Sequence, residues 1–330
     1  MNRLVKTVLA LVLIIVVIQA IIVLYQAVYG VYKYCFMHEL NLLERYGKNT
    51  YVVITGAGSG QGKLYALNFA KRGFHLILMG SERCFTTQQE IARLYPASAV
   101  RVIVVDFGKG EETLMAIEHL FHLMSVDQLD VSVLVNNVGR RTASRPSHHL
   151  SDLNVVQTIN AGTLPQVMLT NRFITYFDSR RDYSAIIFVT AQCVHPNFGL
   201  GIGLDNMISV PYLSVYEATN TFGCFHAHNT IEEYHNSPDC SQDNRIDMLN
   251  VMPGGTITEN TEPFMKQVPF SVPQEELVNN VFKMLGQVNG TTSAHWKHAL
   301  ALYLVNVIPW KKREYLEKTG NLIAKHYMKN

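Results

Sequence analysis

The stretch YVVITGAGSGQGKLYA, residues Tyr51–Ala66, decides the fold of this chain. It opens with a β-branched, apolar run typical of a buried parallel strand, and continues through Gly56, Gly60 and Gly62 into a helical segment. A backbone without Cβ atoms can approach a phosphate, and the unpaired amides that begin a helix lie at the positive end of its dipole. Any tight turn can use glycine, but the position between a strand and a helix favours a turn that binds a dinucleotide pyrophosphate.

From Tyr51 onward, short apolar runs alternate with amphipathic segments of helix length, which is typical of an α/β protein with a parallel sheet. Strands are expected at Tyr51–Ile54, His75–Met79, Val100–Val105, Val131–Val135, Ala185–Thr190 and Arg245–Val251. Helices are expected at Gly62–Arg72, Thr86–Leu94, Glu111–Met124, Leu153–Phe177 and Tyr212–His235. Right-handed crossovers would join these units into a Rossmann-like, doubly wound parallel sheet, with the ligand crevice at the carboxyl ends of its strands.

The first thirty or so residues are unusually apolar. Thr7–Tyr32 contains no charged residue, and Val8–Tyr25 is long enough to cross a bilayer as a helix. A cleaved signal peptide is the competing interpretation, but the apolar run exceeds a normal signal-peptide core and no small-residue cleavage pattern follows it. We therefore expect a retained N-terminal transmembrane helix. Basic residues flank it on both sides, which leaves its orientation open with a slight preference for a cytoplasmic catalytic domain.

The chain divides into an anchor (1–32), a polar connector (33–49), a nucleotide-binding domain (50–258) and a C-terminal part (259–330). Within the last part, Glu259–Lys297 is expected to form a mobile substrate cover. The apolar helix His298–Trp310 is too short to span, so it either lies against the bilayer, lines an acyl or steroid channel, or is a plain core helix. The basic tail Lys311–Lys329 suits anionic lipid headgroups or a solvated end equally.

Composition excludes several classes of function. The net charge of +2 gives no indication of nucleic acid binding, and none is expected. The five cysteines are an odd number without a C-x-x-C pair, and the 13 histidines have no zinc-site spacing, so we expect reduced thiols and no metal. The N-x-[ST] acceptor at Asn289 matters only if the domain faces a lumen.

The end of the second strand commonly decides the cofactor, because an acid there binds the ribose 2′-OH of NAD and repels the 2′-phosphate of NADP. The strand here leads into Met79-Gly80-Ser81-Glu82-Arg83, with no acid at its tip. Ser81, Arg83 and Lys63 could all face a phosphate. The sequence therefore favours NADP(H), and Glu82 is the residue that could reverse this prediction.

Two further polar positions follow the next strands. Asp106 ends the third strand, where its carboxylate can accept from an adenine amino group or can serve as a cap or turn residue. Asn136 and Asn137 follow the strand Val131–Val135, and both nucleotide contact and simple turn chemistry suit them.

With these motifs the chain resembles the short-chain dehydrogenase/reductase family from about Tyr51 to Thr256. TGAGSGQG, the aspartate of VVDF, NNVG, Asn160, Tyr216 and Pro253-Gly254 occur in the order found there. The N-terminal span, GQGKLYA, VPYLSVYEAT, MPGGTITE and Pro309-Trp310 are most similar to the membrane-bound 17β-hydroxysteroid dehydrogenase and very-long-chain 3-oxoacyl-CoA reductase branch.

The resemblance implies a set of cofactor contacts. The pyrophosphate would be held by the turn Gly56, Gly58, Ser59, Gly60, Gln61 and Gly62, the adenine by Asp106, the ribose region by Asn137, and the nicotinamide flanked by Pro253, Gly254 and Thr256. It also implies a lipophilic substrate, either an acyl-CoA or a steroid, and an endoplasmic reticulum membrane. A homodimer is among the assemblies that it allows.

The resemblance also implies a catalytic tetrad of Asn, Ser, Tyr and Lys. This chain differs from it at two of the four positions. Asn160 and Tyr216 are present, whereas Asn220 stands in place of the lysine, four residues after the tyrosine on the same helical face. An amide carries no charge to stabilise a phenolate, so Tyr216 should keep a pKa of about 10. Ala191 stands in place of the serine, and the adjacent Thr190 would point to the other face of an extended strand.

An insertion near His195–Met207 separates this strand from Tyr216. It could bring in a replacement hydroxyl such as Ser209, although a surface loop is the favoured interpretation.

Two hypotheses follow. The first is an NADPH-dependent reductase of a lipophilic ketone, a 3-oxoacyl-CoA or a 17-ketosteroid, because ketone reduction needs a protonated phenol, which an unassisted Tyr216 supplies at neutral pH. The second is a pseudoenzyme that keeps the nucleotide fold and acts as a binding or regulatory partner at the membrane. A buried tyrosine without a chemical role is the alternative for Tyr216 itself.

Overall fold

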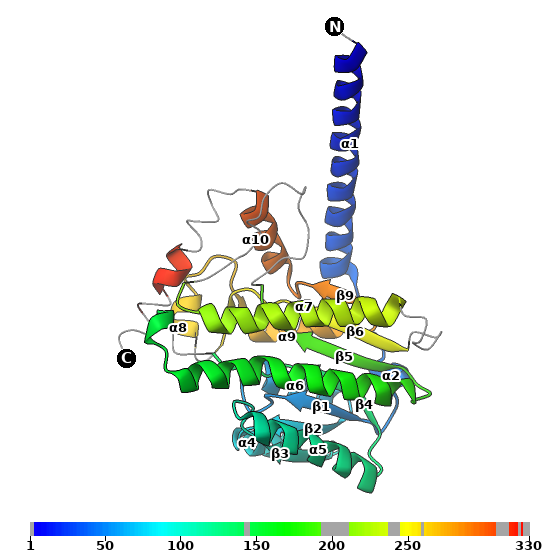
Figure 1. Cartoon of the computed structure of the whole chain (residues 1–330). Helices are drawn as coiled ribbons and strands as arrows, with labels where there is room; N and C mark the ends of the chain where they lie inside the picture. The colour runs from blue at the N-terminus through cyan, green and yellow to red at the C-terminus, as the bar shows by residue number, and fades with distance from the viewer. Residues whose placement is uncertain are drawn as a thin grey trace. The chain divides into compact units, whose positions relative to one another are not determined.

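Strand β1 (Tyr51–Thr55) lies inside a seven-stranded sheet with the order β3-β2-β1-β4-β5-β6-β9 (Figure 1). The others are β2 (His75–Gly80), β3 (Val100–Val104), β4 (Val131–Asn136), β5 (Ser184–Val189), β6 (Ile246–Val251) and β9 (Gly290–Thr292). Every pairing between neighbours is parallel. The chain builds outward from β1 to β3, then returns to the other side of β1 with β4. The predicted doubly wound, Rossmann-like sheet is confirmed.

The structure is a computed structural model that describes residues 3–141, 146–192, 211–236, 245–258, 261–307, 317–322 and 325. The chain separates into two compact units, Met1–His38 and Glu39–Asn330. In the first unit, helix α1 (Arg3–Val31) continues into a π-helical turn, Tyr32–Phe36. The segment Val5–Phe36 has a mean hydropathy of 3.2 at its most apolar, and by length and composition it is a candidate membrane span.

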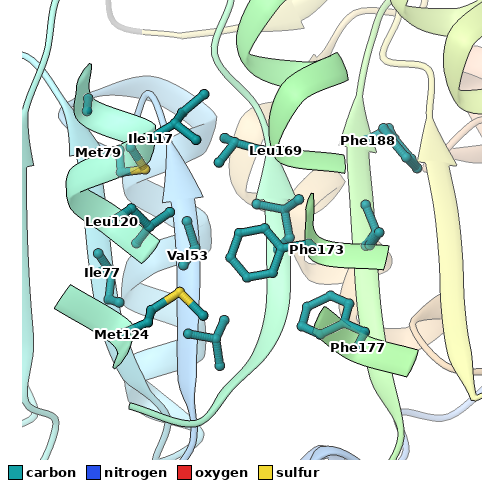
Figure 2. Close-up of a cluster of buried hydrophobic side chains, with 14 of the residues drawn as sticks. Val53, Ile77, Met79, Ile117, Leu120, Met124, Leu169, Phe173, Phe177 and Phe188 are labelled. Atoms are coloured by element: carbon teal, nitrogen blue, oxygen red, sulfur yellow. The ribbon is translucent and has the colours of Figure 1, made fainter. Parts of the chain in front are cut away.

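Helices cover both faces of the sheet. Helices α5 (Gly110–Val126), α6 (Asp152–Asp178) and α7 (Ser214–Asn236) pack beside one another on one face. Figure 2 shows the core beneath them, where Ile117 and Leu120 of α5 and Phe173 of α6 meet strand residues such as Val53 and Ile77. Alternate strand side chains point the other way, toward α3 (Gly60–Lys71), α4 (Arg83–Leu94) and α9 (Gln274–Met284).

The segment Glu259–Lys297, predicted to form a mobile substrate cover, contains elements that pack on the main sheet. Strand β9 extends the main sheet by pairing with β6, and α9 packs on α3, with the Phe282 ring centroid 4.7 Å from that of Phe69. Residues 274–292 therefore belong to the main fold, because α9 carries its buried apolar residues at helical spacing, which is the pattern of a core helix. Outside that range the segment includes helix α8 (Glu262–Met265) and strand β8 (Val272–Pro273), which pairs with β7 (Thr256–Ile257).

The predicted connector also contains ordered structure that belongs to the second unit. Helix α2 (Leu42–Tyr46) ends with a fully buried tyrosine, Tyr46, whose hydroxyl donates to Asp247 Oδ2 at 2.8 Å. Arg45 donates to both oxygens of the same carboxylate, from Nε at 2.6 Å and from Nη2 at 2.9 Å. The Asp247 side chain, near the start of β6, is 4% exposed. Three donors therefore satisfy a buried charge that would otherwise be costly.

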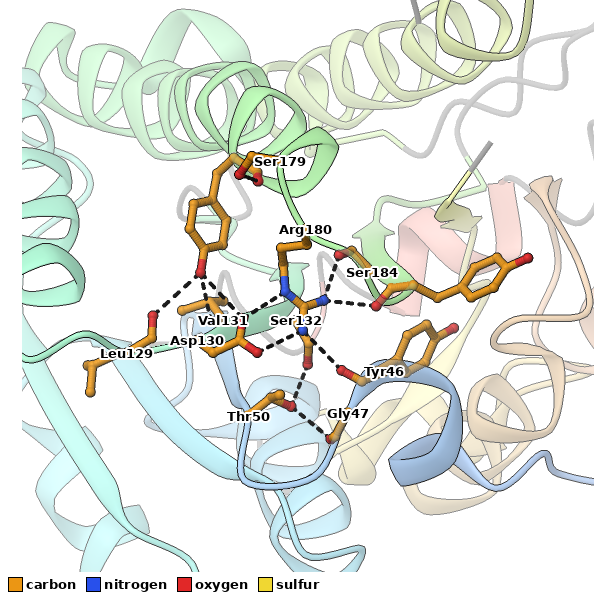
Figure 3. A network of polar contacts seen from close by, with 12 residues as sticks. Tyr46, Gly47, Thr50, Leu129, Asp130, Val131, Ser132, Ser179, Arg180 and Ser184 are labelled. Carbon is orange, nitrogen blue, oxygen red and sulfur yellow. Dashed lines mark hydrogen bonds and ion pairs between the residues drawn. The ribbon is translucent and has the colours of Figure 1, made fainter. Parts of the chain in front are cut away.

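We call the contacts of Arg45 and Tyr46 with Asp247 the Asp247 lock. Figure 3 shows a second polar network that lies beside it. Arg180, which follows α6, donates to both oxygens of Asp130 at 2.7 and 2.9 Å, to Ser184 Oγ at 2.8 Å and to Tyr46 O at 3.2 Å. These residues lie at the amino ends of β4 and β5 and at the end of α2. The network thus joins β4 and β5 at the amino ends of the strands, whereas the glycine-rich turn lies at the carboxyl end of β1.

Helix α10 (Trp296–Val307) begins two residues before the predicted apolar helix, and residues 308–310 of that prediction lie outside the described residues. It has two kinds of surface. Residues such as His298 and Leu302 are buried, whereas Trp296 (49%), Leu300 (38%) and Tyr303 (48%) are exposed at helical spacing. The core interpretation therefore holds for one face, while the other leaves apolar side chains uncovered.

Candidate active site

The glycine-rich turn between β1 and α3 has the geometry that only glycine allows. Gly56 has φ +68°, and a Cβ on Gly62 would lie 2.2 Å from Gly56 O, so the first turn of α3 packs directly on the loop. The amides at the start of α3 are thereby held at the carboxyl end of β1. This is the arrangement that binds a phosphate through backbone N–H groups and the helix dipole.

The turn opens onto the point where the strand order reverses, between β1 and β4. Thr55 Oγ1 donates to Val135 O at 3.2 Å and accepts from the amides of Asn137 (2.9 Å) and Val138 (3.0 Å). Asn137 Nδ2 returns a bond to Thr55 O at 2.9 Å. Asn137 therefore connects neighbouring strands at the position where an open α/β sheet binds its ligand.

A cavity of about 630 Å³ lies on one side of this crevice. Its lining includes predicted cofactor residues from four loops: Gly56, Gly58, Ser59, Ser81, Asp106 and Asn137. Glu82 and Arg140 also line it. Its position beside the turn and the ends of β2 and β3 suits the adenosine half of a dinucleotide.

Asp106 takes the turn role that the sequence left open, and it lies where the predicted adenine contact requires it to be. Its Oδ1 accepts from Gly108 N at 3.0 Å, which is a turn contact, and the residue also lines the cavity. Arg140 Nη1 lies 3.3 Å from the same oxygen, and both side chains are 41% exposed. The sequence analysis did not identify Arg140 as a site residue, because its only signal is its position directly after NNVG.

The cations expected to face a phosphate are placed differently. Lys63 forms an ion pair with Glu90 of α4 at 2.7 Å. The Cβ of Arg83 lies against Gly58, and within the described residues the cavity lining includes Ser81 and Glu82 from this segment. Of the three groups named for NADP, Ser81 is thus the one that the structure brings to the cavity.

A second cavity, of about 300 Å³, lies on the other side of Asn137. Gly60, Gln61, Tyr216 and Asn220 line it, so the structure brings the glycine turn and the tyrosine of the tetrad to one space. Among the residues that the structure describes, the Oε1 of Gln61 is buried without a hydrogen-bond partner, which leaves an acceptor available in this lining.

The Asn220 amide, at the lysine position, bonds to its own helix. Its Nδ2 donates to Tyr216 O at 2.9 Å, and Thr219 Oγ1 donates to the same carbonyl at 2.8 Å. In the part of the chain that the structure describes, no lysine, arginine or histidine lines this cavity.

The remaining tetrad positions are accounted for as follows. Ala191 follows β5 and offers no hydroxyl, and Thr190 Oγ1 donates to Asn250 Oδ1 at 2.9 Å, although Thr190 also lines the cavity. Asn160 Nδ2 donates to Gly108 O at 3.0 Å, in the turn that follows Asp106. The insertion 195–207 and Ser209 lie outside the described residues.

Gln166 is a site residue that sequence reasoning missed. It lines the smaller cavity from α6, and its Nε2 donates to Gly223 O at 2.8 Å and to His226 Nδ1 at 3.1 Å. Burial lowers the pKa of His226, which favours the neutral ring that can accept this bond. Nothing in the sequence marks Gln166, because a single amide on a long helix carries no motif.

The family model for the short chain dehydrogenase matches residues 50–200. This part of the chain matches the short-chain dehydrogenase family. The match covers the glycine turn, Asp106, NNVG and Asn160, while Tyr216 lies beyond it.

Curated relatives match this chain beyond residues 50–200. Human 17-beta-hydroxysteroid dehydrogenase type 3 is 31% identical over 187 residues, which cover 56% of this chain and 54% of that protein, about half its length. Chicken hydroxysteroid dehydrogenase-like protein 1 is 24% identical over 82% of this chain and 75% of its own. A very-long-chain 3-oxoacyl-CoA reductase of Caenorhabditis elegans is 26% identical over 84% of this chain and 80% of its own.

Among solved structures, one from a study of 7beta-hydroxysteroid dehydrogenase stereoselectivity has a TM-score of 0.64. The alignment covers 85% of this chain and 100% of that one, at 18% identity. This likeness supports the fold. The predicted family, and its relation to hydroxysteroid dehydrogenases and 3-oxoacyl-CoA reductases, is therefore confirmed.

Proposed function

We propose that this chain is a membrane-bound oxidoreductase that uses NADP(H) to reduce a lipophilic ketone, a 3-oxoacyl-CoA or a 17-ketosteroid. The observation that carries the proposal is that Tyr216 lines one cavity with Gly60 and Gln61 of the glycine turn. A phenol in this position can donate a proton to a ketone oxygen while a dinucleotide bound at the turn delivers hydride. The substrate classes follow those of the named relatives.

A second function, a catalytically inactive nucleotide-binding or regulatory partner, is favoured by a specific observation. The Asn220 amide bonds to the Tyr216 carbonyl, and Ala191 lacks the serine hydroxyl. Positioned acid–base groups are each worth about 10²–10⁴ in rate, so the loss of two leaves slow chemistry unless another group replaces them. The glycine turn supports nucleotide binding under both functions.

Turnover separates the two functions. NADPH oxidation would be followed with a panel of ketosteroids and 3-oxoacyl-CoAs, using the full chain in detergent. A reductase should turn over at least one ketone, and Tyr216→Phe, which removes only the hydroxyl, should abolish the reaction. No turnover with any ketone, together with tight binding of the nucleotide, would contradict the reductase and support the binding partner. Gly62→Ala serves as the control that should lose nucleotide binding, because its Cβ would meet Gly56 O.

Wild-type protein is expected to bind NADPH about fivefold more tightly than NADH, because the tip of β2 has no acid and Arg140 lines the adenosine cavity. Glu82 lines it too, so Glu82→Gln should tighten NADPH binding more than NADH binding, whereas Arg140→Gln should weaken NADPH more. Fluorescence titration with each nucleotide measures this preference. Equal affinity, or a preference for NADH, would mean that Glu82 faces the ribose and that the NADP assignment is wrong.

We also propose that the chain resides in the endoplasmic reticulum membrane through a single N-terminal span, with the catalytic domain on the cytoplasmic side. Deletion of Met1–Tyr32 should release only part of the protein from the membrane pellet, because α10 exposes Trp296, Leu300 and Tyr303. Alkaline carbonate extraction and salt washes of both forms measure the release. As a matched control, the same deletion with these three residues changed to serine should be released completely. If the deletion alone is fully soluble, α10 acts as an ordinary core helix.

A further inference from the structure

His298, in the first turn of α10, holds the loop that follows β6. Its Nδ1 accepts from the Gly254 amide at 3.1 Å, and its Nε2 lies 3.1 Å from Gly255 O. Because an amide can only donate, Nδ1 must be the acceptor, and Nε2 must carry the proton that is donated to the carbonyl. The residue is 1% exposed, and burial lowers its pKa to about 4, which keeps the ring neutral near neutral pH.

Gly254 has no room for a side chain at this contact. A Cβ there would lie 2.6 Å from Gln192 Oε1 and 2.9 Å from His298 Cδ2. Gln192 also bonds to this loop, because its backbone N–H donates to Pro253 O at 3.0 Å. Its side-chain Nε2 donates to His298 O at 3.2 Å and to Ser293 Oγ at 2.8 Å. The end of β5, the loop after β6 and the start of α10 therefore meet at one glycine.

The loop held in this way connects two borders of the smaller cavity. Val189 and Val251 are partners at the carboxyl ends of β5 and β6, and Val189 lines the cavity that contains Tyr216. Thr258, directly after β7, lines the same cavity. A shift of the Gly254–Gly255 backbone would therefore move the wall on the Tyr216 side of the site, and leave the adenosine cavity beyond Asn137 in place.

We propose that His298 is a positioning residue for the nicotinamide end of the dinucleotide. By bonding to the Gly254 amide and to the Gly255 carbonyl, it fixes the position of this loop relative to the bound nicotinamide ring. The identity of the ligand rests on the proposed function. The loop has two adjacent glycines, whose backbone freedom is large, so a fixed ring with two directed bonds removes conformations that would compete with binding.

The test compares a whole dinucleotide with half of one. NADPH, NADH and ADP, which has the adenosine and diphosphate but no nicotinamide, would be titrated into the full chain by calorimetry. His298→Leu removes both ring contacts at similar volume, and His298→Asn retains an acceptor for Gly254. The matched control is His295→Leu, because His295 is buried in the same region but bonds to other groups. Its Nδ1 accepts from the Lys297 amide at 3.1 Å, and its Nε2 lies 3.4 Å from Glu276 Oε2.

For His298→Leu, we expect about tenfold weaker binding of the dinucleotide, the scale for loss of a buried hydrogen-bonded group, with ADP affinity unchanged. His298→Asn should be intermediate, and His295→Leu should leave the ratio of dinucleotide to ADP affinity unchanged. Equal weakening of ADP and dinucleotide, no weakening of either, or failure of both His298 variants to fold would overturn the positioning role alone. Wild-type protein that binds neither ADP nor a dinucleotide would overturn the proposed function, and this role with it.

Discussion

Replacing Asn220 by lysine together with Ala191 by serine is expected to raise NADP(H)-dependent alcohol oxidation about 100-fold or more, since each positioned group contributes on that scale. Asn220 lines the Tyr216 cavity, one helical turn from the phenol, and its amide now bonds to the Tyr216 carbonyl. An ammonium there would favour the phenolate that oxidation needs, and each unit by which the pKa of Tyr216 falls corresponds to about 1.4 kcal/mol. Oxidation should therefore gain more than reduction.

Asn220→Lys alone should give a small gain and the double variant a larger, non-additive one, as residues that act as a unit do. The matched control is Asn220→Met, which has a similar reach without the charge and should give no gain. Turnover would be measured in both directions for wild type and all variants. If wild type already turns over at an ordinary rate and Asn220→Lys leaves it unchanged, another group has taken the place of the lysine and the inactive-partner hypothesis falls.

Replacing Asp247 by alanine is expected to lower the free energy of unfolding by about 3–5 kcal/mol, the cost of breaking a buried ion pair from one side. The substitution would leave the Arg45 guanidinium and the fully buried Tyr46 hydroxyl without their shared acceptor. The Asp247 lock lies at the amino end of β6, whereas the glycine turn lies at the carboxyl end of β1. The folded fraction should therefore still bind nucleotide with wild-type affinity.

Urea unfolding of Asp247→Ala and Asp247→Asn measures this cost. Asparagine retains the shape and one acceptor, so its loss should be smaller. Replacing both partners, as Arg45→Met with Asp247→Leu, should restore part of the stability because no charge is then left unpaired. A loss below about 1 kcal/mol for Asp247→Ala would show that water solvates the arginine in the variant.

Much of the fold could be predicted because the β-branched runs and the glycine turn are local signals. The six predicted strands match the observed ones to within a residue or so at each end. Strand β9 was missed because Gly290–Thr292 is three residues long and has no apolar run; only its pairing with β6 makes it a strand. Helix α2 was missed because a five-residue helix shows no period, and its stability comes from contacts with Asp247, 200 or so positions away.

The candidate site divides in the same way. Gly56, Asp106 and Asn137 were predicted because each follows a strand in a fixed motif, and the structure places all three at one cavity. The orientation of Lys63 could not be predicted, since its pairing with Glu90 depends on how α3 packs against α4. Likewise His298 carries no motif, and its role arises only where α10 meets the loop after β6.

The lock between α2 and β6 sets a limit on how the soluble part can be produced. A truncated protein designed from the matched family would begin at residue 50 and would lack Arg45 and Tyr46. Asp247 would then lack these three hydrogen bonds, and the ion pair between Glu39 and Arg72, which follows α3, would be lost as well. Such a protein should aggregate during expression, whereas one that begins before Glu39 retains both ties and is the suitable starting point for crystallisation.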